Sequence, residues 1–395
     1  MAEHSYSFLL LFGAICVTLF FLGYIAKIIR FPSIVFFVLA GILLGGFISG
    51  EHTLERISEL GIVLLFFYLG LEFKIERALQ VAKKIWLVGL LDILLNFALI
   101  ILLMKLLNFD LFTAFLIAGL SYASSSAITT KIIVDNKRVA NPETELILGL
   151  MVFEDIFSPL ILAILSSFAV TKTLSLKVIV IILIKVLAVF AIFTAITFLV
   201  RDKLAKLIES ILEEDIFVLF TLGLVILAAG ITKKIGLSEA LGAFLAGVLI
   251  AECGKEKEIE KYLLPIKDLA VALFFMVFGA SIAIGKIKID ERLISILIVL
   301  IAFSIVGKFL TGFIGGLLYG LSKRSAAIAG FSIINRGEFS VVMTKFAPST
   351  LLPLAGVYVL TMSLLGTIFA QYAPTLARLI FPRKKKKKKR KISYT

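Results

Sequence analysis

Two adjacent carboxylates, Glu154 and Asp155, lie inside an otherwise apolar run of the sequence at 144–170. They come about ten residues into the run, ~15 Å along a helix, which is near the middle of a hydrocarbon core ~30 Å thick. One charge at that depth costs ~2.5 to 3.5 kcal/mol on insertion scales, so packing alone does not explain the pair. A buried carboxylate can instead hold a proton at one pH and a cation at another. The pair therefore indicates competition between protons and a cation.

Further oxygen ligands for a cation are expected one turn along the same run. Pro159 has no N–H to donate to the main-chain carbonyl of Asp155, and Ser158 adds a hydroxyl group. Hard cations take oxygen ligands. We therefore expect Asp155, Glu154 and Ser158 to form a site for a cation or a proton. In the alternative interpretation, Pro159 only kinks the helix.

A lysine, Lys308, lies in the interior of another apolar run at 292–319. It is too deep to reach the membrane surface easily, so it must lose its proton or pair with a carboxylate. Glu154 is the candidate partner. If Lys308 releases a proton when the cation arrives, two protons move against one cation and net charge crosses the membrane. Asp92 and Asn96, in the run 84–105, are weaker candidates, because solvation at a helix end or local pairing explains them.

Polar residues interrupt two more apolar runs, at 111–134 and 324–346. The first run carries hydroxyl groups, which can satisfy the backbone where a membrane helix unwinds. These are Ser125, Ser126, Thr129 and Thr130. The second run carries Asn335, Arg336 and Glu338. Two interrupted helices in matching positions indicate the substrate site of a transporter. The alternatives are close packing through small residues in the first run and a purely structural Arg336–Glu338 pair in the second.

The elements that position these residues must be membrane helices. Hydrophobic residues make up 60% of the 395, whereas soluble domains contain ~45 to 50%. A spanning helix needs roughly 20 apolar residues, and this criterion gives about 13 spans. They lie near 6–29, 32–49, 58–73, 84–105, 111–134, 144–170, 175–200, 214–233, 237–252, 263–284, 292–319, 324–346 and 352–378. The first is expected to be a retained helix, because it runs into the second without a cleavage site.

The sequence also repeats itself. Residues 26–45 align without gaps on 232–251, which matches Gly41 with Gly247. Gly70 and Gly279 follow at nearly the same offset, each after a Phe-Phe pair. We therefore predict an all-α membrane protein with two inverted six-helix repeats, at 6–170 and 214–378, joined by a linker helix at 175–200. Secondary transporters with inverted repeats bind substrate near the midplane where the repeats meet.

Charge is distributed unevenly along the chain. Lys and Arg favour the cytoplasmic side of a membrane, and their positions predict an outside N-terminus and a cytoplasmic C-terminus in the plasma membrane. The tail, 383–395, begins with nine consecutive basic residues, which we expect to anchor on anionic headgroups. RNA binding or a regulatory contact is the alternative for the tail. Topology and tail thus account for the net charge of +14, and no nucleic-acid partner is expected.

Metal clusters and redox cofactors are not expected. The chain has only two cysteines, Cys16 and Cys253, and two histidines, His4 and His52. The cysteines lie in or beside apolar runs, and the histidines lie at the chain start and in a loop. These residues offer neither a disulfide framework nor a cysteine metal cluster.

Taken together, these motifs resemble the monovalent cation:proton antiporters, specifically the NapA-like and Kef-like branch. The resemblance covers about 8–378 and rests on the acidic pair, Lys308, the stretch GLSEALGAFLAGVLIAE at 236–252 and NRGEF at 335–339. It implies that Asp155 carries the cation, that Glu154 exchanges partners with Lys308, and that a core domain moves against a dimerisation domain in a homodimer. The first acidic position departs from the family, because it is Glu. Kef-like systems also carry a soluble nucleotide-binding domain, and gating of that kind is not expected here.

The resulting functional hypothesis is exchange of sodium or lithium for protons by alternating access. Potassium/proton exchange by the same fold is the alternative, and a cation channel with one acid per subunit is a more remote one. The acidic pair argues against a carrier of organic anions. An intramembrane aspartyl protease needs a Gly-Asp context, which the sequence lacks. We therefore expect a transporter and not an enzyme.

Overall fold

A computed structural model describes residues 8–29, 31, 33–48, 52–71, 75–171, 176–211, 216–235, 237–281 and 291–382. Within these ranges the chain is helical, and the only β-type pairing is one isolated bridge. The expected all-α architecture is confirmed for this part of the chain. The basic tail expected at 383–395 lies outside the described residues.

The N-terminal half contains helices of very different lengths. They are α1 (Phe8–Ile28), α2 (Ser33–Ile48), α3 (His52–Leu71), α4 (Ile75–Ile93), the π-helical turn η1 (Leu94–Ala98), α5 (Leu99–Leu106), α6 (Leu111–Tyr122), α7 (Ser126–Asp135) and α8 (Pro142–Thr171). The C-terminal half has the same character. It contains α9 (Leu176–Ile211), α10 (Ile216–Lys234), α11 (Glu239–Glu252), α12 (Glu256–Ser281), α13 (Glu291–Leu318), α14 (Lys323–Ser332), α15 (Glu338–Met343), the 3₁₀ turn η3 (Thr344–Phe346) and α16 (Leu352–Ile380).

Among the described residues, 7 helices are long and apolar enough to cross a membrane. Two shorter apolar helices, Ser33–Gly45 and Leu111–Tyr122, add to them. The protein is thus a multi-pass membrane protein, but the expected count of about 13 spans is not confirmed and stays a prediction.

The helix expected as a linker at 175–200 is longer than the sequence indicated. It continues as α9 to Ile211 and has 36 residues. At ~1.5 Å per residue this exceeds the ~30 Å of the hydrocarbon core. The extension, 201–211, keeps its helical form because Leu, Ala, Lys and Glu are good helix formers. A membrane span predicted from apolar residues ends at the first charged residues, whereas the helix itself continues through them.

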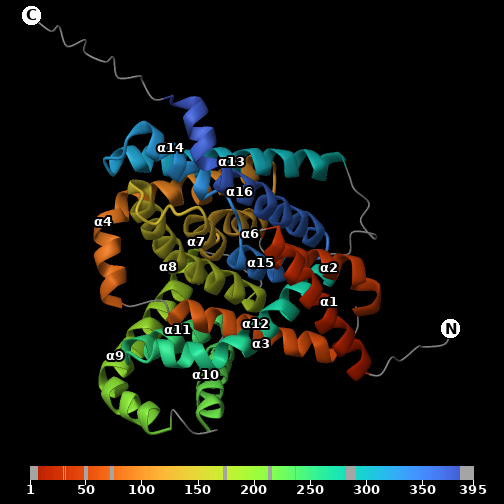
Figure 1. Ribbon diagram of the computed structural model, residues 1–395, viewed down its shortest axis with the longest axis vertical. Helices are drawn as coiled ribbons and strands as arrows, with labels where there is room; N and C mark the ends of the chain where they lie inside the picture. The colour runs from red at the N-terminus through yellow and green to blue at the C-terminus, as the bar shows by residue number, and fades with distance from the viewer. Residues whose placement is uncertain are drawn as a thin grey trace, which may run out of the picture.

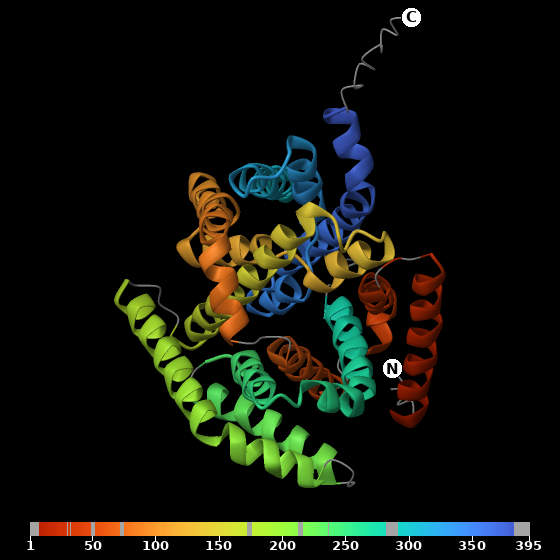
Figure 2. The ribbon, with the colours of Figure 1, turned by 60° about the vertical axis from the view of Figure 1, so that its left-hand side comes forward.

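The helices form two bodies (Figures 1 and 2). One contains α4 to α8 and α13 to α16, and the other contains α1 to α3 and α9 to α12. In the second body α2 packs along α12, and α3 packs along both α11 and α12. The site residues come from the first body.

Glycine permits the closest of these helix contacts. A Cβ atom on Gly70 of α3 would overlap the carbonyl oxygen of Phe244 in α11, and one on Gly247 of α11 would overlap that of Phe67 in α3. The two backbones therefore touch at this crossing, as small residues allow in membrane proteins. The second body is thus held by close backbone packing.

Candidate functional site

Two helices are broken in the middle of the first body. Helix α6 ends at Tyr122 and α7 begins at Ser126, while α14 ends at Ser332 and α15 begins at Glu338. The extended segments between them meet, and Ser124 pairs with Arg336 in the isolated antiparallel bridge. Ser125 caps α7 by accepting a hydrogen bond from the Ile128 N–H at 3.3 Å. The interruptions expected from the polar residues are therefore present, and the two breaks lie against each other.

Asn335 links the two broken helices by hydrogen bonds. Its Oδ1 accepts from the Ser125 N–H at 2.9 Å, and its Nδ2 donates to Thr129 Oγ1 at 2.8 Å and to the Ser332 carbonyl at 3.2 Å. A side-chain amide can do this because it offers both a donor and an acceptor. Thr130, expected at the crossing, is exposed instead.

Opposite charges lie at the opposite ends of the half-helices. The Arg336 guanidinium is fully buried and donates to the carbonyl of Ser121 at 2.7 Å, near the end of α6, and to that of Ile334 at 2.9 Å, just after α14. Glu338 begins α15 and accepts from Ser125 Oγ, at the start of α7, at 3.3 Å. Helix C-termini favour cations and N-termini favour anions, so the two side chains match the four ends.

This arrangement corrects one interpretation of the sequence. The sequence offers a purely structural Arg336–Glu338 pair as an alternative, but the salt bridges among the described residues do not include one between them. Each side chain instead binds the other broken helix, because the extended segments place their atoms at separate helix ends.

The acidic pair is on α8, and its first member is bound on two sides. Lys308 Nζ, from α13, lies 2.8 Å from Glu154 Oε1, and both side chains are fully buried. From the crossing, the Ser124 N–H donates to Glu154 Oε2, and Ser124 Oγ lies 3.2 Å from Oε1. Glu154 therefore joins the broken helix α6/α7 to Lys308, the partner expected from the sequence.

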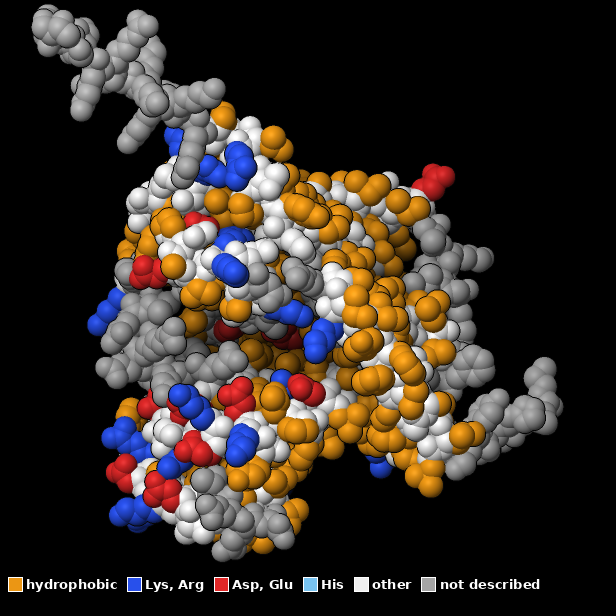
Figure 3. Space-filling model, viewed as in Figure 1, with side chains coloured by type: hydrophobic (Ala, Val, Ile, Leu, Met, Phe, Trp, Pro, Cys, Tyr) orange, Lys and Arg blue, Asp and Glu red, His pale blue; other side chains and the backbone are white. Residues whose placement is uncertain are grey.

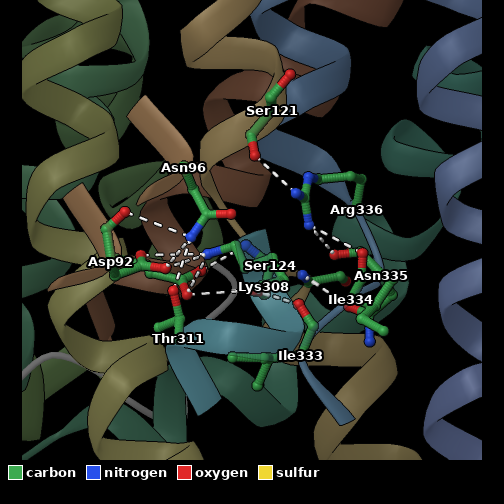
Figure 4. Close-up of polar contacts among 12 residues, drawn as sticks. Asp92, Asn96, Ser121, Ser124, Lys308, Thr311, Ile333, Ile334, Asn335 and Arg336 are labelled. Atoms are coloured by element: carbon green, nitrogen blue, oxygen red, sulfur yellow. Dashed lines mark hydrogen bonds and ion pairs between the residues drawn. The ribbon is translucent and has the colours of Figure 1, made fainter. Parts of the chain in front are cut away.

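Asp92 and Asn96 lie in the same buried cluster as Lys308, although the sequence indicates them only as weaker candidates. Asp92 is fully buried in α4, with Oδ1 2.9 Å and Oδ2 3.2 Å from Lys308 Nζ. Asn96 lies in the π-helical turn η1 and donates to Asp92 Oδ1 at 2.8 Å and to Thr311 Oγ1 at 2.9 Å (Figure 4). Solvation at a helix end is thus wrong for Asp92. The signal was available, since the depth argument used for Glu154 applies equally to an aspartate inside the run 84–105.

Asp155 and Ser158 occupy different environments from Glu154. Asp155 follows Glu154 by ~100° around the helix and is half-buried, whereas Glu154 is fully buried. Ser158 is fully buried, and its Oγ has no hydrogen-bond partner among the described residues. Pro159 does not end α8, which continues to Thr171. Figure 3 shows acidic side chains at the bottom of a hollow in the middle of one face. Of the acidic pair, Asp155 is the less buried member.

Comparison with protein families gives one match over most of the chain. The family model described as "Sodium/hydrogen exchanger, transmembrane" matches residues 16–375. Among solved structures, the sodium proton antiporter MjNhaP1 from Methanocaldococcus jannaschii is similar with a TM-score of 0.70 and 17% identity, covering 93% of this chain and 98% of that one. At this identity the likeness concerns the fold.

Three relatives differ in the cation that they are named for. The Ammonium/H(+) antiporter subunit AmhT of Alkalihalophilus pseudofirmus is 35% identical, covering 95% of both chains. The K(+)/H(+) antiporter subunit KhtU of Bacillus subtilis is 32% identical, covering 90% of this chain and 91% of its own. The High-affinity Na(+)/H(+) antiporter NhaS3 of Synechocystis is 26% identical, covering 86% of this chain and 74% of its own.

Proposed function

Since this chain belongs to the family of transmembrane sodium/hydrogen exchangers, and is a cation/proton antiporter, we propose that the cation and the proton compete for Asp155. One observation carries the assignment. Of the two adjacent acids, Glu154 is fully buried and contacts Lys308, whereas Asp155 is half-buried. Ser158, one turn away with an unused buried oxygen, is the second proposed ligand.

The proposed cargo is a cation of the size of potassium. Potassium and ammonium have nearly the same radius, and AmhT and KhtU, both above 30% identity, are named for these ions. Sodium or lithium, the cations expected from the sequence, form the second candidate, which the likeness to a sodium antiporter at 26% identity supports. A site that fits the larger ions binds sodium less well, because the oxygen ligands cannot close around it.

Coupling is proposed to run through the Glu154–Lys308 pair. Alternating access exposes one site to each side in turn, so competition for Asp155 becomes exchange. If the ion pair breaks and re-forms in each cycle and a proton accompanies this step, two protons move against one cation. The proposal also includes a homodimer in the plasma membrane, with the N-terminus outside and the C-terminus in the cytoplasm, as the Lys and Arg distribution favours.

The experiment that tests Asp155 uses purified protein in liposomes with an imposed pH gradient. Proton movement is followed while potassium, ammonium, sodium or lithium is added. Asp155→Asn should reduce exchange below about a tenth of wild type while the protein stays folded, since an amide has the shape of a carboxylate but does not titrate. The control is Asp202→Asn, because Asp202 is a carboxylate with 90% side-chain exposure on α9. Exchange above a tenth of wild type in Asp155→Asn would refute the assignment.

The cation series separates the two candidate cargoes in the same assay. Exchange driven by potassium and ammonium at lower concentrations than sodium supports the proposed cargo. The reverse order assigns the protein to sodium.

A further inference from the structure

The buried cluster around Lys308 contains one more carboxylate than the lysine needs. Lys308 Nζ contacts Glu154 at 2.8 Å and Asp92 at 2.9 and 3.2 Å, and all three side chains are fully buried. One carboxylate would neutralise one ammonium group. A second buried charge adds a desolvation cost, so it is not explained as packing.

The two carboxylates differ in what holds them. Glu154 is bound by Ser124, which belongs to the crossing and in turn donates to the Ile333 carbonyl of the other broken helix at 2.8 Å. Asp92 lies beside Tyr122 at the end of α6, but it has no hydrogen bond to the extended segments 123–125 and 333–337 among the contacts given for the described residues. Its Oδ1 accepts instead from Asn96, at 2.8 Å. Glu154 therefore belongs to the crossing, and Asp92 belongs to the α4/α13 side of the cluster.

The α4/α13 side is built tightly around Asp92. The π-helical turn η1 places Asn96 one turn after Asp92, and π-turns of this kind occur frequently at functional sites. Asn96 Nδ2 also donates to Thr311 Oγ1 of α13 at 2.9 Å. Gly307, next to the lysine, leaves room for this amide, since a Cβ atom there would lie 2.6 Å from Asn96 Oδ1. Asp92 thus has a fixed orientation toward Lys308.

From this geometry we infer that Asp92 is a positioning residue, which holds the head of Lys308 in place while Glu154 exchanges between Lys308 and the crossing. The inference rests on the proposed function, in which the Glu154–Lys308 pair breaks and re-forms. Asp92 keeps a carboxylate beside the lysine at every stage, so the pair can open without leaving a buried ammonium group without a counter-charge.

This role affects turnover more than cation binding. Without the Asp92 charge, Glu154 is the only carboxylate that the described contacts place on Lys308. Opening that pair then leaves the Lys308 ammonium group without a carboxylate partner, so the conformational change between the two access states becomes slower. Asp155, where the cation is proposed to bind, keeps its own environment. We therefore expect Asp92→Asn to lower kcat at least tenfold and to change KM for the cation less than threefold.

A variant with the two side chains exchanged separates charge from packing. The double variant Asp92→Asn/Asn96→Asp has the composition of wild type and returns one carboxylate to the same side of the cluster, about one helical turn away. We expect it to recover at least a third of wild-type kcat. The experiment measures initial exchange rates against cation concentration in proteoliposomes, with Asp202→Asn as the control and with thermal unfolding of each purified variant as the measure of folding.

Each outcome decides for or against this role. A tenfold fall in kcat for Asp92→Asn with recovery in the double variant supports it. Wild-type kcat in Asp92→Asn overturns it, and so does a folded double variant with no exchange. If Asp92→Asn does not fold, the kcat of the folded double variant decides alone: recovery to at least a third of wild type supports the role, and no exchange overturns it. If neither variant folds, Asp92 is needed for the stability of the fold, and the positioning role is overturned. Failure of the proposed function is distinct, because wild-type protein would then show no cation-driven exchange.

Discussion

At the residue scale, the chemistry depends on where three charged side chains meet. Glu154, Lys308 and Asp92 come from three different helices and are all fully buried. Each alone would be expensive in hydrocarbon, and together they compensate one another only in part, since two negative charges face one positive charge. Asp155 follows Glu154 in α8 and is half-buried, and it is the residue at which we propose that the cation binds.

Lys308→Gln tests whether this ion pair moves charge. Moving one elementary charge through 100 mV is worth ~2.3 kcal/mol, so exchange of two protons for one cation must respond to membrane potential. We expect wild-type exchange to be accelerated by a potential of one sign. The variant should keep part of the exchange and lose most of that dependence. The measurement is exchange in proteoliposomes clamped at several potentials, and wild-type exchange that ignores the potential would exclude this role for Lys308.

At the element scale, the broken helices form the candidate site, and the glycine contacts hold helices of the other body together. The breaks expose main-chain groups, which Asn335 and Arg336 satisfy from the second broken helix, while Glu338 accepts a hydrogen bond from the Ser125 hydroxyl group. In the other body, Gly41 of α2 and Gly279 of α12 make a close contact like that of Gly247 and Gly70. The sequence repeat matches Gly41 with Gly247 and Gly70 with Gly279, so the two contacts correspond to each other. This supports the proposed inverted repeats, whose boundaries stay a prediction.

Gly247→Ala tests the α3/α11 contact. The added methyl group would overlap the Phe67 carbonyl, and overpacking typically costs ~1 to 3 kcal/mol. We expect a lower melting temperature in detergent and reduced exchange. The matched control is Gly223→Ala on α10, where nothing lies within 4 Å of the new Cβ atom. Because alanine is the better helix former, the control should match wild type or exceed it. Equal melting temperatures for the two variants would contradict the close contact.

At the scale of the whole molecule, the site lies in the first body, and the paired glycine contacts of α2, α3, α11 and α12 lie in the second (Figures 1 and 2). Large apolar side chains are exposed on both, including Leu106 and Leu318 on the first body and Leu43 and Leu199 on the second. A soluble protein rarely exposes so much apolar surface, whereas lipid covers it here. Relative movement of the two bodies would carry the site from one face of the membrane to the other, as alternating access requires.

The basic tail is expected to lie outside this movement. Replacement of residues 383–391 by alanine should leave exchange rates in liposomes nearly unchanged, because the tail follows the last predicted span and neither predicted repeat includes it. The binding of the tail itself to anionic headgroups should weaken instead, by ~1 kcal/mol for each basic residue near the surface. Rates are compared in liposomes with and without anionic lipid. Loss of exchange in folded, inserted protein would make the tail part of the mechanism.

The sequence by itself determined the class of the protein and the depth of its charges. Apolar run lengths show how far a charge lies from water, and the cost of burial singles out Glu154, Asp155 and Lys308 without knowledge of the fold. Hydroxyl groups inside an apolar run indicate a broken helix for a similar reason, since unwound backbone needs partners. These are local properties of the chain, and the family comparison agrees with the interpretation drawn from them.

Only the tertiary structure decided that two carboxylates, and not Glu154 alone, meet Lys308. Lys308 contacts Asp92 across 216 residues of sequence, and the Glu154 contact spans 154. The energy that singles out a buried charge depends on depth, but its partner depends on how helices pack, and no local pattern encodes that. For the same reason the sequence predicts Thr130 at the crossing, where its side chain is exposed, and offers an Arg336–Glu338 pair as an alternative, whereas each of these two side chains binds the end of another helix.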